Sequence, residues 1–82
     1  MEYNEIKIGQ RLKKIRTEIG MSQQALARAL YVLQATLCKI ERGYGLPSIS
    51  TLFALAEFFN RKVSYLLCED DSEIVTSNSM SL

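Results

Sequence analysis

The chain has 82 residues, of which 48% are hydrophobic and 23% are charged, and its formal net charge is only +1. This size allows one small domain with a modest core, and a composition with one proline and four glycines excludes low-complexity segments and repeat arrays. With no histidine and only two cysteines, a Cys/His zinc site and a dense disulfide framework are excluded, so we expect free thiols, no metal and no cofactor.

The chain begins with a predicted amphipathic helix that Gly20 ends. Its apolar face, at steps of four, three and four residues, consists of Ile8, Leu12, Ile15 and Ile19. A second row of the same helix is mostly cationic and consists of Lys7, Arg11, Lys14 and Glu18. The outer face of this helix is therefore expected to be basic.

Two short helices follow. Ser22 suits the N-cap of the first, QQALARAL, which turns Leu26, Ala27 and Leu30 inward. The second is expected to run from about residue 34 to residue 42, to turn Leu37 and Ile40 inward and to end before Gly43.

The connection between these two helices contains two unexpected residues. Tyr31 stands where a tight turn favours glycine, and Leu33 stands where a helix favours Ser or Thr as its cap. Each departure costs on the order of 1 kcal/mol, which does not prevent folding. Leu33 is expected to act as a hydrophobic flank that packs toward Leu37.

The rest of the sequence predicts a fourth helix that begins after Ser48, ends at Asn60 and buries Leu52, Leu55, Ala56 and Phe59. A last short helix is expected around residues 63–68. The predicted fold is all-α, a compact five-helix bundle. We expect an N-terminal extension at residues 1–5, the domain at residues 6–68, and an acidic and polar tail at residues 69–82.

Charge is segregated along the chain. All ten lysines and arginines lie between Lys7 and Lys62, and residues 6–67 carry a formal charge of +7. Acidic residues before and after this segment return the total to +1. A basic body with acidic ends is typical of a polyanion binder, although a solvated basic face on a small domain explains the charge equally well.

In family order and spacing, the segments IGQRLKKIR, SQQALA, KIERG, LPS, LAEFFN and YLL span residues 8–67. Together they resemble the XRE family of helix-turn-helix regulators, which includes phage repressor and Cro proteins. The resemblance implies a lambda repressor-like DNA-binding domain. In that fold, two short helices joined by a tight turn present the second helix to the major groove of double-stranded DNA.

By this resemblance, the helix that starts at Gln34 enters the groove. A glutamine can pair with adenine, the methyl group of Thr36 can touch a thymine methyl, and Lys39 can reach a guanine or a phosphate. The candidate base-reading residues are Gln34, Ala35, Thr36, Cys38 and Lys39. Without the surrounding pattern, these residues would be interpreted as ordinary exposed helix surface.

The candidates for contacts to the DNA backbone are Gln23, Arg11, Lys14, Arg28, Arg42 and Tyr44. Family members often carry Lys or Arg in the loop after the recognition helix, where this chain has the neutral Tyr44, Gly45 and Leu46. The Tyr44 hydroxyl can take over that contact. The resemblance assigns Arg16 and Glu41 a different role, as a structural ion pair that fixes the angle between helices.

Phe58, Tyr65 and Leu67 are candidates for a subunit interface, because symmetric dimers of such modules read two half-sites. We therefore expect a homodimeric transcriptional regulator, a repressor on an inverted-repeat operator, with antitoxins and restriction-system controllers as close variants. The alternative is a protein-interaction module on the same fold.

An enzyme is not expected, because we find no nucleophile beside a base and no phosphate-binding glycine loop. We expect a cytoplasmic protein without a membrane segment, since there is no long apolar run and no secretion signal.

Overall fold

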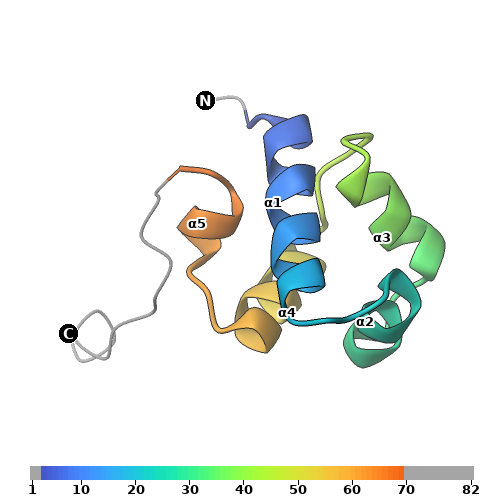
Figure 1. The fold of residues 1–82 in the computed structure, drawn as a ribbon. Coiled ribbons are helices and arrows are strands. Elements are labelled where there is room, and N and C mark those ends of the chain that lie inside the picture. Colours follow the sequence, from blue (N-terminus) through green and yellow to red (C-terminus); the bar gives the residue numbers. More distant parts are fainter. Residues whose placement is uncertain (1–2, 70–82) are drawn as a thin grey trace.

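A computed structural model describes residues 3–69, which form five helices (Figure 1). Their bounds are α1 Glu5–Glu18, α2 Gln23–Leu30, α3 Gln34–Glu41, α4 Ile49–Phe59 and α5 Val63–Leu66. The all-α architecture predicted from the sequence is therefore confirmed. Of the predicted tail, only Glu69 lies within the described residues.

The helices begin and end at residues with recognisable local chemistry. Asn4, Ser22 and Ser48 cap α1, α2 and α4, because each side chain accepts a hydrogen bond from a backbone N–H three residues later. Gly20 after α1 and Gly43 after α3 have positive φ angles, 77° and 81°.

The helix bounds differ from the expected ones at three places. The first helix begins at Glu5, within the residues expected to form the extension, because Asn4 caps it. The third helix ends at Glu41, and Arg42 is its C-cap. The last helix ends at Leu66 instead of residue 68, since Cys68 adopts a left-handed conformation with φ 62°.

The core lies between the five helices, of which α1 packs against α3 and α5 while α4 packs against α2 and α5. Its members are Ile8, Leu12, Ile15, Leu26, Ala27, Leu37, Ile40, Leu52, Leu55, Ala56, Phe59, Tyr65 and Leu66. Leu30, predicted to be inward, packs only partly against this core, while Ile19 is exposed.

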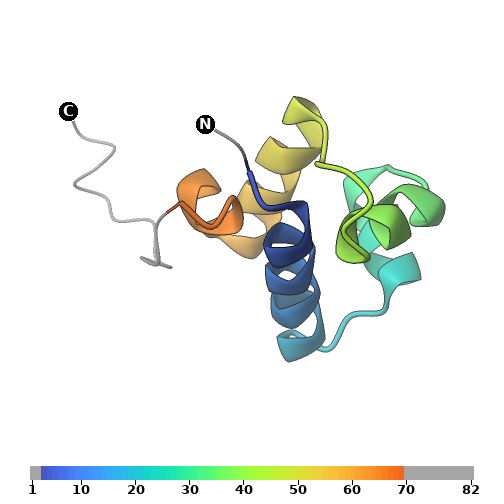
Figure 2. The same cartoon turned by 90° about the horizontal axis from the view of Figure 1, so that it is seen from above.

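The arrangement leaves α3 at the edge of the molecule. In both ribbon views, α5 lies on one side of α1 and the pair α2 and α3 lies on the other (Figures 1 and 2). One side of α3 packs against α1 and α2. Its opposite side is therefore open within the described part of the chain.

Candidate nucleic-acid interface

The outer face of α3 displays the residues that the sequence singled out for base reading. Leu37, Ile40 and Glu41 are buried on the inner face. Gln34, Ala35, Thr36 and Lys39 are exposed, whereas Cys38 is half-buried and offers less surface. The helix thus presents a mixed surface of amide, methyl, hydroxyl and ammonium groups.

Close packing against α1 holds α3 in place. A Cβ atom added at Gly9 would overlap the carbonyl oxygen of Ile40 and lie 2.9 Å from that of Glu41. Only glycine permits this approach of α1 to α3. Sequence reasoning missed this role, although an isolated glycine inside a helical pattern often marks a close contact.

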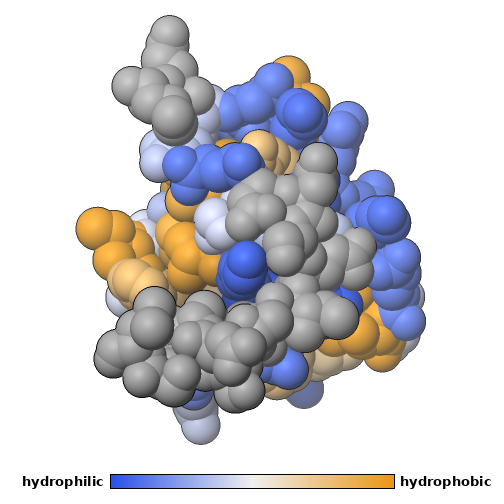
Figure 3. Space-filling model, turned by 90° about the vertical axis from the view of Figure 1, so that its left-hand side faces the viewer, coloured by the Kyte–Doolittle hydropathy of each residue, from blue (hydrophilic) through white to orange (hydrophobic). Residues whose placement is uncertain are grey.

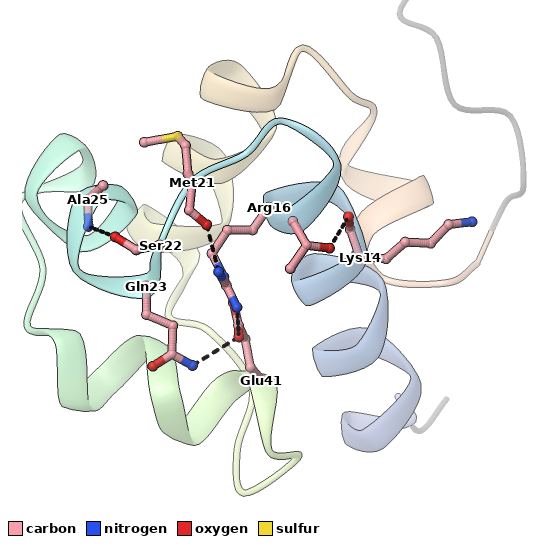
Figure 4. A network of polar contacts seen from close by, with 8 residues as sticks. Lys14, Arg16, Met21, Ser22, Gln23, Ala25 and Glu41 are labelled. Atoms are coloured by element: carbon pink, nitrogen blue, oxygen red, sulfur yellow. Dashed lines mark hydrogen bonds and ion pairs between the residues drawn. The ribbon is translucent and has the colours of Figure 1, made fainter.

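A buried ion pair holds the end of α3. Arg16 Nε donates to Glu41 Oε2 at 2.6 Å and Arg16 Nη2 donates to Glu41 Oε1 at 3.0 Å, so the pair is bidentate. Arg16 Nη1 also donates to the carbonyl oxygen of Met21 at 2.7 Å (Figure 4). The hydrogen bonds to Glu41 raise the pKa of Arg16 and outweigh burial, which lowers it. Arg16 is therefore a structural cation and is not available to DNA.

The same carboxylate fixes the start of α2. Gln23 Nε2 donates to Glu41 Oε1 at 3.0 Å, and in Figure 4 the Gln23 side chain points toward this group. Sequence reasoning assigned Gln23 to the DNA backbone and did not foresee this contact. The bond occupies one amide donor, while the residue stays half-exposed at the outer end of the network.

The start of α3 has no comparable support. Leu33 occupies the N-cap position, makes no side-chain cap hydrogen bond and is 74% exposed. The expectation that it packs toward Leu37 is therefore wrong, because its side chain remains in solvent. Tyr31 adopts the left-handed conformation expected of a glycine, with φ 59°, and is 96% exposed.

The candidates for backbone contacts divide into two groups. Lys14, Arg28, Arg42 and Tyr44 are exposed. The Arg42 guanidinium lies over the Tyr44 ring, 5.5 Å from its centre, so these two side chains form a unit at the end of α3.

Arg11 requires a correction. It donates to the Tyr65 carbonyl oxygen at 2.8 Å, and its guanidinium lies 4.1 Å from the centre of the Tyr65 ring. These contacts join α1 to α5, so Arg11 is a packing residue with little freedom to reach a phosphate.

The three candidates for a subunit interface differ in their exposure. Tyr65 is only 6% exposed and belongs to the core of the single chain, so it has little surface for a second subunit. Leu67 packs partly against the core. Phe58 is 43% exposed and lies on α4, where Ile49 and Phe53 are exposed as well.

An open groove of about 440 Å³ separates the end of α2 from α4, and its lining consists of Ala29, Leu30, Tyr31, Ala54, Glu57 and Phe58. Residues 43–60 contain no lysine or arginine. This part of the surface therefore carries no cation, and its groove is lined by apolar side chains together with Glu57. Figure 3, which views the molecule from the side of α5, shows hydrophilic groups along the upper and right-hand edges and hydrophobic groups on the left, with smaller hydrophobic areas at the top and lower right.

Among residues 3–69, no group of three or more acidic, cysteine or histidine side chains is placed to hold a metal ion. No helix within this range is long and apolar enough to cross a membrane.

Comparison with known proteins identifies this arrangement. The family model described as helix-turn-helix matches residues 12–66. The activator BcrR of Enterococcus faecalis is 32% identical over 71 residues, which are 87% of this chain and 32% of that protein. The chain therefore spans about a third of the length of this relative.

Two solved structures share the fold. The restriction-modification controller C.AhdI from Aeromonas hydrophila is 31% identical with a TM-score of 0.70, over 76% of this chain and 94% of that one. SinR, the master regulator for biofilm formation, is 38% identical with a TM-score of 0.68 over 73% of this chain and 97% of that one, and it was solved in complex with DNA.

Proposed function

Because this chain belongs to the XRE family of helix-turn-helix transcriptional regulators, we propose that it represses transcription as a homodimer on an inverted-repeat operator. The observation that carries the proposal is the exposed outer face of α3. Its inner face and its end are fixed by Gly9 and by the Arg16–Glu41 pair, so the helix as a whole is held against α1. Rigid presentation lowers the entropy cost of binding.

Base reading is proposed for the exposed part of α3. Gln34 can form two hydrogen bonds with the N6 and N7 atoms of adenine. Lys39 lies on the same open side and can donate to a guanine. Thr36 contributes a methyl group for contact with thymine. These contacts supply sequence specificity.

Phosphate contacts are proposed for Lys14, Arg28, Arg42 and Tyr44, whose side chains are exposed. They add affinity without sequence information. Stacking of Arg42 on Tyr44 reduces the freedom of both side chains before DNA is bound, which favours a joint contact to the backbone beside α3.

The dimer is proposed to form through the outward face of α4. Ile49, Phe53 and Phe58 are exposed there, and no cation lies between Arg42 and Arg61. Two bodies of charge +7 repel each other least where they meet through such a surface. A symmetric pair would place two α3 helices on half-sites whose centres lie about 34 Å apart.

Repression is the simplest regulatory outcome, because occupancy of an operator can itself block transcription, whereas activation also requires a contact to the transcription machinery. Control of a restriction system is a variant of the same activity, and the similarity to C.AhdI supports it.

A protein-interaction module remains the second candidate. The groove between Tyr31 and Phe58 favours it, because the lining of this groove combines apolar side chains with Glu57 and includes no residue of α3. Such a module would bind a protein partner without a sequence-specific DNA site.

Selection from a random pool of DNA duplexes tests the proposal. We expect an enriched inverted repeat that the protein prefers over random sequence by about a thousandfold or more. Its affinity should decrease steeply with salt, with a log–log slope of magnitude roughly 3 to 8, because phosphate contacts release counterions.

A pool without enrichment would refute sequence-specific binding. A single unpaired site bound by one protomer would refute the dimer and leave DNA recognition intact.

A further inference from the structure

Leu33 has no role in the fold that explains its presence. It occupies the N-cap position of α3, where Ser or Thr would accept a hydrogen bond, and it makes no side-chain cap hydrogen bond. Its side chain is 74% exposed, so it gains little from burial. A residue that lacks both a cap contact and core packing calls for an explanation outside the folded chain.

Its location suggests the explanation. Leu33 directly precedes Gln34, and it lies at the end of α3 whose first residues, Gln34, Ala35 and Thr36, are exposed. In helix-turn-helix proteins the first residues of the recognition helix meet the edges of the bases. The Leu33 side chain therefore extends the candidate reading surface by one apolar group.

The groove beside α4 offers no alternative partner for this residue. That groove is lined by Tyr31 and Phe58 among others, and Leu33 is not among its lining residues. Tyr31 and Leu33, the two unexpected residues of this turn, therefore belong to different surfaces.

We propose that Leu33 determines specificity by contacting the 5-methyl group of a thymine in the major groove. This inference rests on the proposed function. A leucine side chain cannot donate or accept a hydrogen bond, and the thymine methyl is the apolar group that base edges present in the major groove. Cytosine at the same position carries only a hydrogen at C5, so the leucine side chain would lose this apolar contact.

Replacement of single thymines by uracil in the selected site tests this contact, because uracil lacks only the methyl group. For the unmodified protein, we expect the change at one thymine of each half-site to weaken binding about three- to fivefold. For Leu33→Ser, the same change should have no effect. Leu33→Ser also introduces a capping side chain, so unfolding cannot account for the lost discrimination.

Two control variants isolate the effect. Thr36→Ser removes a methyl group from another residue at the start of α3, and the uracil effect that depends on Leu33 should persist in this variant. Ile19→Ser removes an exposed aliphatic side chain at the end of α1 and should leave every uracil effect unchanged.

The possible results separate this inference from the proposed function. If Leu33→Ser keeps the full uracil effect at every thymine, Leu33 does not read a methyl group, although DNA recognition stands. If no thymine responds to uracil in the unmodified protein, the inference is equally wrong. If no preferred site is enriched at all, the proposed function is refuted first.

Discussion

The two helices of the helix-turn-helix have the same length and the same first residue, but they begin in different ways. α2 and α3 each have eight residues and start with glutamine. Ser22 caps α2 by accepting a hydrogen bond from the Ala25 N–H at 3.0 Å, and Gln23 is bound to Glu41. Leu33 provides no such cap for α3, and Gln34 is exposed.

This difference indicates that the starts of the two helices have different roles. The start of α2 is fixed to the scaffold, and so is the end of α3, because both meet the Glu41 carboxylate. The start of α3 is left with free hydrogen-bonding capacity and an exposed apolar group, which suits contact with an external partner. Substitutions at both helix starts and in the Glu41 network break or sharpen this comparison.

The largest effect is expected in the Glu41 network, which holds the start of α2 and the end of α3. Glu41→Ala leaves the buried Arg16 charge without its partner and removes the contact of Gln23, so we expect a loss of about 3–5 kcal/mol in the free energy of unfolding. Denaturation in urea measures it. Because the hydrogen bonds to Glu41 raise the pKa of Arg16 above its ordinary value, the guanidinium stays charged and the stability that depends on its charge is fully present at every pH below that ordinary value.

Glu57→Ala is the matched control, since Glu57 is an exposed glutamate on α4. Its effect should stay within about 0.5 kcal/mol. Equal effects of both substitutions would show that the Glu41 network does not stabilise the fold.

The next largest effect is expected in DNA binding, at the exposed start of α3. Gln34→Ala should weaken binding to the selected site by about 1–3 kcal/mol and change binding to random DNA little, because only base contacts carry sequence information. Gln24→Ala removes an exposed glutamine from α2 and serves as the control. Equal losses on selected and random DNA would exclude base reading by Gln34.

A smaller pair of effects with opposite signs compares the two helix starts directly. Ser22→Ala removes the cap of α2 and should lower stability by about 1 kcal/mol. Leu33→Ser supplies a cap to α3 and should raise stability by a similar amount, a shift of roughly 4–8 °C in Tm. A lower Tm for Leu33→Ser would show that Leu33 is packed in solution.

The sequence predicted the helices and their caps better than the contacts between the helices. The apolar period of α1 and the caps Ser22 and Ser48 are local signals, so the helices could be placed from the residues alone. The pairing of Arg16 with Glu41 came from the family resemblance. The residue spacing could not have supplied it, because the two residues lie in different helices.

Other contacts between distant residues could not be predicted. Arg11 belongs to the cationic row of α1, for which the helical period predicts exposure to solvent. Only the position of α5 shows that Arg11 binds Tyr65. Gly9, as an isolated glycine in a helical pattern, indicates a close contact, but the sequence does not show that this contact is with the backbone of α3. Leu33 lies four residues before Leu37, and this spacing suggested that the two side chains pack together. Leu33 is the N-cap of α3, however, and an N-cap residue does not follow the helical period.

The smallest effect is expected at Tyr31, where two contributions oppose each other. Tyr31→Gly relieves a left-handed conformation that costs about 1 kcal/mol in a non-glycine residue, but glycine loses about 0.5–1 kcal/mol more conformational entropy on folding. We expect a net gain of at most about 0.5 kcal/mol in urea denaturation, and a smaller one for Asn60→Gly, because asparagine tolerates this conformation better. DNA selection should return the same site for Tyr31→Gly, since this side chain faces the groove beside α4. A changed site would mean that the open surface at the start of α3 includes the turn as well.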